Sequence, residues 1–181
     1  GMVTVVVVPE AGGRIVEHKL GGHPYLWVES AGSAEGREER QAAGPQNPLG
    51  SSGGVAMAVG KTLPDLTATN TPGLALTTAK WSGRITVARG RTAEVVLTSP
   101  EDKDTGLQLT RTVQLFGGSS QLRVTDKLTN VCARAAEWAV AQVTRVPGSL
   151  QSGERFSDKS RLYLPLSPDS RFEGGFRLRD A

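Results

Sequence analysis

The chain has 181 residues, of which 38% are hydrophobic and 22% are charged. These shares exclude a disordered tail, and no apolar run approaches the ~20 residues that a membrane-spanning helix needs. The formal charge of +3 is mild, so neither a nucleic-acid nor a membrane partner is expected. The 22 glycines and 10 prolines exceed the usual share, which predicts many turns and short strands.

Cysteine and histidine are too few for common disulfide and metal chemistry. Cys132 is the only cysteine, which excludes an internal disulfide and a zinc site built on thiolates. His18 and His23 form no metal-binding array, so we expect no metal and no cofactor. A glycine before the first methionine is typical of a cleaved tag, and the following valine run lacks the basic residues of a signal peptide. The expected location is cytoplasmic.

Strand signals follow one another along the chain, because β-branched residues alternate between clusters of Gly, Pro, Asn and Ser. Strands are expected at residues 3–8, 13–20, 24–29, 53–60, 73–80, 84–89, 92–99, 107–115 and 122–128, with two last ones at 161–165 and 171–178. Residues 30–52 contain one large aliphatic side chain, Leu49. They are expected to form a long loop, either a solvated excursion or a lid over a site.

The clearest pair of strands predicts its own register. Residues 107–115 and 122–128 both alternate apolar and polar residues, and an even-length loop at 117–120 brings their apolar faces together. Leu115 then faces Leu122, and Arg111 faces Asp126 on the apolar side. This Arg–Asp pair could orient a ligand or be a structural ion pair.

Residues 132–146 are ambiguous. Their alanines suit a helix by propensity, whereas residues 137–144 also suit a strand buried on both faces, which the neighbouring hairpin favours. With no internal repeat and no alternation of strands and helices, the sequence predicts an all-β sandwich with residues 1–181 as a single domain.

Several segments resemble the galactose mutarotase-like superfamily of β-sandwiches, which includes the aldose 1-epimerases. Residues 9–16 are similar to its opening strand, and residues 22–27 to the hairpin strand that follows. The stronger stretch runs over residues 97–148, where the strands appear in the family's order. This resemblance implies a large antiparallel β-sandwich, truncated or compact, that binds a carbohydrate or sugar-like ligand.

The chain departs from that family where catalysis is expected. Asn130 matches the family's strand-closing asparagine, but the strand after it contains no histidine. The chain also stops at Ala181, before the family's late catalytic glutamate. Because the acid–base pair is missing from its expected positions, no catalytic residue is assigned and no mutarotase reaction is expected.

Two Trp-containing pairs are the candidate substrate-binding residues. Trp138 and Gln142 have the same parity on one strand, so a sugar could stack on the indole and bond to the amide. Trp81 and Arg84 are a similar pair at the start of a strand. Each tryptophan could instead be a core residue.

Two other functions stay open. One is a divergent epimerase or lyase-like enzyme that uses Glu94, Glu137 or Glu154 as its base, and the other is an interaction module without a small ligand. A homodimer is also expected, with residues 161–178 as the contact, because a short sandwich leaves an edge or face to cover.

Overall fold

The computed structural model describes residues 2–28, 53–61, 73–87, 90–147 and 168–170. The chain divides into two compact units, Gly1–Pro147 and Gly148–Ala181, and both sheets belong to the first. In the second unit only the turn at 168–170 is described. The loop predicted at 30–52 and the strands predicted at 161–165 and 171–178 lie outside the described residues, and the single domain over 1–181 stays a prediction.

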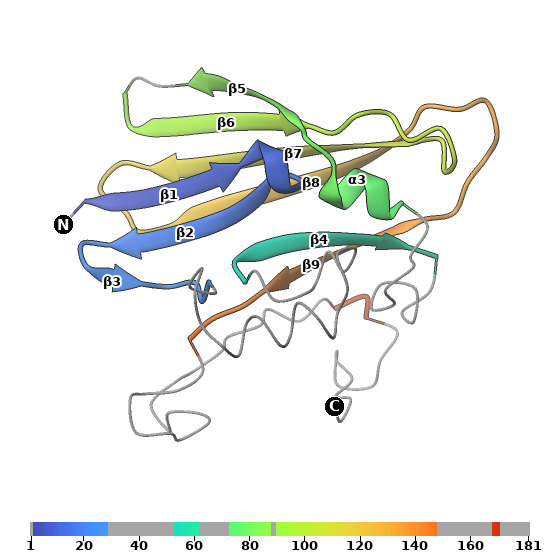
Figure 1. The fold of residues 1–181 in the computed structure, drawn as a ribbon. Coiled ribbons are helices and arrows are strands. Elements are labelled where there is room, and N and C mark those ends of the chain that lie inside the picture. The colour runs from blue at the N-terminus through green and yellow to red at the C-terminus, as the bar shows by residue number, and fades with distance from the viewer. Residues whose placement is uncertain (1, 29–52, 62–72, 88–89, 148–167, 171–181) are drawn as a thin grey trace. The chain divides into compact units, whose positions relative to one another are not determined.

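The first sheet combines strands that are distant in the sequence (Figure 1). Its spatial order is β1 (Val3–Val8), β2 (Arg14–Leu20), β4 (Val55–Gly60) and β9 (Ala139–Thr144), with the short β3 (His23–Pro24) beside β2. Within the ambiguous segment 132–146, the strand is β9, because all of it pairs with β4, from Gly60 opposite Ala139 to Val55 opposite Thr144. The prediction of burial on both faces is wrong, since the residues of β9 are exposed or half-buried at the edge of the sheet.

The second sheet consists of consecutive hairpins. Its spatial order is β5 (Ser82–Val87), β6 (Thr92–Thr98), β7 (Leu107–Phe116) and β8 (Leu122–Asn130), all antiparallel. The predicted register is confirmed, since Leu115 lies opposite Leu122 and Arg111 lies opposite Asp126. The described residues thus form a sandwich-like, all-β fold of two antiparallel sheets, as the sequence predicts.

Two predicted strands are wrong in kind or length. Residues 73–80 contain a short helix, α3 (Leu74–Thr78), because this segment connects β4 in one sheet to β5 in the other and its Leu76 enters the core. Of the strand predicted at 24–29, residues 24–28 are described, and among them only Pro24 belongs to a strand, β3. The chain leaves β2 after Tyr25, and the Trp27 amide donates a hydrogen bond to the Arg145 carbonyl instead.

Apolar side chains of both sheets form the core between them, in two clusters. One contains Met57, Val59, Leu76, Trp81, Leu97, Leu107 and Leu109, and the other contains Ile15, Leu26, Val55 and Val113. Every residue of β4 is buried. This strand is therefore the centre of the first sheet in packing as well as in order.

Candidate functional site

Trp81 and Arg84 flank the start of β5 but differ in exposure. The Trp81 side chain is only 2% exposed, and its indole N–H donates a hydrogen bond of 2.6 Å to the Leu76 carbonyl of α3. Arg84 is exposed on β5. Both residues line a hollow of about 480 Å³ between β1 and β5. A tryptophan buried to this degree contributes to the core and offers no open ring face for stacking.

Trp138 lies just before β9, at the edge of a different hollow of about 560 Å³. Its ring is partly buried against the core, and the Lys61 ammonium lies 5.1 Å from the ring centroid. The hollow, which we call the Trp138 hollow, is lined by Lys61, Asp104, Thr105, Cys132, Arg134, Ala135, Ala136, Glu137, Trp138 and Ala139. It combines one aromatic ring with two cationic and two carboxylate side chains.

Two hydrogen-bonded turns build the walls of the Trp138 hollow. In the first, the Thr105 amide and hydroxyl both donate to the Asp102 carboxylate, which fixes the turn that carries Asp104. In the second, the Asn130 side chain accepts a hydrogen bond of 3.0 Å from the Cys132 amide and donates one of 2.7 Å to the Arg134 carbonyl. Short polar side chains that bond to nearby backbone groups are typical turn formers.

Gln142 is exposed on β9, directly opposite Met57, and is not among the residues that line the Trp138 hollow. The sequence analysis missed Lys61, Asp104 and Arg134. Lys61 directly follows β4. Because Gly60, the last residue of β4, lies opposite Ala139 of β9, the pairing brings Lys61 close to Trp138. No local sequence signal indicates that pairing, although Asn130 and Asp102 are recognisable turn residues.

The three carboxylates considered as bases have different surroundings. Glu137 lines the Trp138 hollow, whereas Glu154 lies outside the described residues. Glu94 is on β6, where its carboxylate accepts hydrogen bonds from the Thr86 hydroxyl and, at 2.6 Å, from the Gln114 amide. The bond from Thr86 and then that from Gln114 lower the pKa of Glu94, which makes this carboxylate a weaker base.

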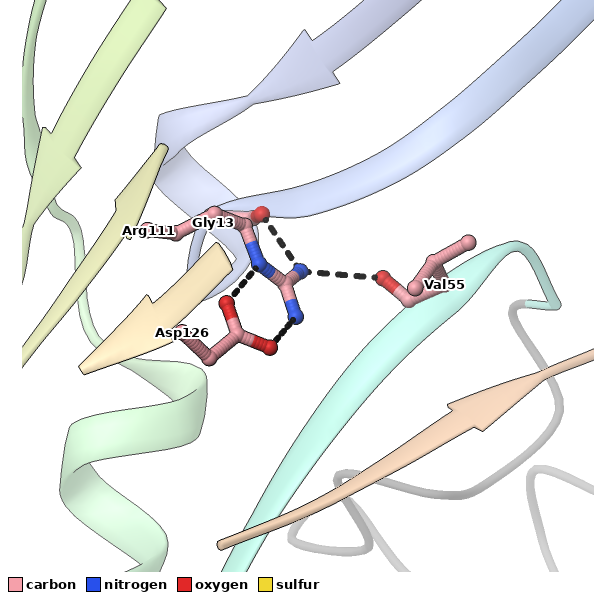
Figure 2. Close-up of polar contacts among 4 residues, drawn as sticks. All are labelled: Gly13, Val55, Arg111 and Asp126. Atoms are coloured by element: carbon pink, nitrogen blue, oxygen red, sulfur yellow. Dashed lines mark hydrogen bonds and ion pairs between the residues drawn. The ribbon is translucent and has the colours of Figure 1, made fainter. Parts of the chain in front are cut away.

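Arg111 connects the two sheets (Figure 2). It forms a two-pronged ion pair with Asp126, with N–O distances of 2.8 and 2.9 Å, and the two side chains are 0% and 7% exposed. Its remaining terminal nitrogen donates to the carbonyls of Gly13, at 3.0 Å, and of Val55, at 3.3 Å. Because these bonds engage all three guanidinium nitrogens of a fully buried side chain, the geometry favours the structural role over ligand orientation.

A second arginine lies near this pair. Arg14, at the start of β2, is buried and donates a hydrogen bond of 2.9 Å to the Gly53 carbonyl. Burial lowers the pKa of Arg14, and the neighbouring charges of Arg145 and Arg111 lower it further. Three guanidinium groups, those of Arg14, Arg111 and Arg145, therefore lie near one another at this junction.

Among the described residues, no group of three or more His, Cys, Asp or Glu side chains is placed to hold a metal ion. No helix in this part of the chain is long and apolar enough to cross a membrane. The comparisons with protein-family models, curated proteins and solved structures gave no match.

Proposed function

We propose that the chain binds a carbohydrate or sugar-like ligand in the Trp138 hollow. The observation that carries this proposal is the partly buried indole of Trp138 beside charged and hydroxyl side chains in a hollow of about 560 Å³. That volume is within the ~300–1,000 Å³ of small-molecule sites. A sugar needs both an apolar ring face to stack on and several donors and acceptors for its hydroxyls.

The charges of the hollow suit a ligand with many hydroxyl groups. Lys61 and Arg134 supply only donors, and Asp104 and Glu137 supply acceptors when ionised. Lys61 also lies over the Trp138 ring. A sugar that stacks on this face would displace the ammonium, which could then donate to a hydroxyl group. The resemblance of residues 97–148 to mutarotase-like proteins supports the same ligand class.

Binding can be tested on a glycan array, followed by titration of the tryptophan fluorescence with each sugar that binds. Trp138→Ala is expected to weaken binding at least tenfold. Trp27→Ala is a matched control, because Trp27 is 37% exposed and also has a cation, Arg145, 5.9 Å from its ring centroid. Failure to bind any sugar, or an equal loss in both variants, would contradict the proposal.

The enzymatic alternative has one observation in its favour, since Glu137 lines the same hollow. The segment that follows Asn130 contains no histidine, so we expect no interconversion of galactose or glucose anomers in polarimetry. Interconversion above the buffer rate that is lost in Glu137→Gln would instead support a divergent epimerase.

A further inference from the structure

Ile85 points toward the interior of the sandwich but is not covered there. It lies directly opposite Val95 in the pairing of β5 with β6, so the two side chains project from the same face of the sheet. Val95 packs against the core, whereas Ile85 is 71% exposed. An inward-facing isoleucine with this exposure indicates that the first sheet does not extend over β5.

The uncovered space is a groove between β1 and β5, the end strands of the two described sheets. It is the hollow of about 480 Å³ that Trp81 and Arg84 also line, and we call it the Ile85 groove. Its apolar walls include Val5 and Val7 of β1 together with Ile85 and Val95. A strand added beside β1 would extend the first sheet over this groove.

The β1 strand is suited to such an addition. It contains five valines and one threonine, has no charge, and includes Val6, which is exposed. Among the described strands, only β2 pairs with it. Edge strands usually carry charges, prolines or bulges that prevent pairing with another chain. β1 has no charge and no proline, and its pairing with β2 shifts register between Val6 and Val7.

We propose that β1 pairs in antiparallel fashion with β1 of a second copy of this chain, so that valine side chains of the copy cover the Ile85 groove. A two-fold axis places a strand against itself, which requires a self-complementary surface. Val3–Val8 meets this requirement, because it presents β-branched side chains to one another and brings no like charges together. This surface differs from residues 161–178, the contact expected from the sequence.

The test is the solution mass of the chain by light scattering over a concentration series. We expect twice the 19.1 kDa chain mass for the unmodified chain and a shift to the monomer for Ile85→Lys, which places a charge in the groove at an exposed position. Thr125→Lys, on the exposed face of β8, is the matched control and should leave the dimer intact.

Cross-linking provides a second measurement that does not depend on disrupting the dimer. In a Cys132→Ser background, a chain with both Thr4→Cys and Val6→Cys should form an intermolecular disulfide under mild oxidation, whereas Thr125→Cys should not. The two positions share one face of β1, so a two-fold antiparallel pair centred near Val5 places Thr4 opposite Val6 of the copy, and a pair centred on either residue places that residue opposite itself. A chain that is monomeric at every concentration overturns the proposal. So does a dimer that Ile85→Lys weakens no more than Thr125→Lys, or one in which the β1 cysteines do not cross-link.

Discussion

Arg111 and Glu94 belong to adjacent strands, β7 and β6, of the same sheet but lie on opposite faces of it. Arg111 faces the core, where its ion pair with Asp126 is buried and its other donors reach the carbonyl of Val55 in β4 and that of Gly13, the residue before β2. Glu94 faces away from the core and bonds to Thr86 and Gln114 within its own sheet. Both clusters are well hydrogen-bonded, but only the buried one joins two sheets, so burial should decide their contributions to stability.

The largest effect is expected for Asp126→Ala. It leaves the buried Arg111 guanidinium without its counter-charge and should reduce the free energy of unfolding by about 3–5 kcal/mol. Urea denaturation measures this change. A control that replaces both partners by apolar residues, Arg111→Met with Asp126→Leu, should recover part of the loss. A loss below about 1 kcal/mol would show that the pair is solvated in solution.

Gly13→Ala should have the next largest effect. The Gly13 φ angle is +65°, and a Cβ atom there would lie 2.7 Å from a ring carbon of Trp81. Overpacking and left-handed strain together should cost about 2–4 kcal/mol. Gly21→Ala is the matched control in thermal unfolding, because it has a similar φ of +59° but no heavy atom near the added Cβ. Equal losses would show that backbone strain alone is responsible.

Glu94→Gln should have a smaller effect that depends on pH. The folded state lowers the pKa of Glu94, so the stability gained from its ionised form is present above the pKa of the unfolded chain. It is lost as the pH falls through the lowered folded-state pKa. The difference in unfolding midpoint between the unmodified chain and this variant should therefore disappear in acid. A difference that is unchanged there would contradict this assignment.

The smallest effect is expected for Lys80→Ala. The Lys80 ammonium lies 3.8 Å from the Glu10 carboxylate, and both side chains are mostly exposed. Solvent screens such a pair, so the free energy of unfolding should change by no more than about 0.5 kcal/mol. A larger change in the free energy of unfolding, measured in urea, would contradict this expectation. It would show that solvent exposure does not explain the difference in strength between the Glu10–Lys80 pair and the Arg111–Asp126 pair.

The register of β7 and β8 could be predicted because it depends on local information. Alternation fixed which residues share a face, and the turn between the strands allowed only one parity that brings the apolar faces together. This placed Arg111 opposite Asp126 without any knowledge of the other sheet. The carbonyls of Gly13 and Val55 could not be predicted as partners, since they are 98 and 56 residues away in the sequence.

The candidate site was predicted less completely for the same physical reason. Trp138 was singled out by its residue type, but Lys61 reaches its ring only through the pairing of β4 with β9. A strand is predicted at residues 73–80, yet tertiary packing of Leu76 with Trp81 stabilises the short helix α3 instead. Local patterns predict the elements, and contacts between distant strands decide which side chains meet.

The position of β4 also has a consequence for synthesis of the protein on the ribosome. Its six uncharged residues are all buried, and β9, its partner along its full length, begins about 80 residues later in the sequence. At a translation rate of ~5–20 residues per second, the nascent chain presents β4 without β9 for roughly 4–16 s. The whole second sheet is made in this interval. Its hairpins can form first and provide the surface that shields β4 from other nascent chains.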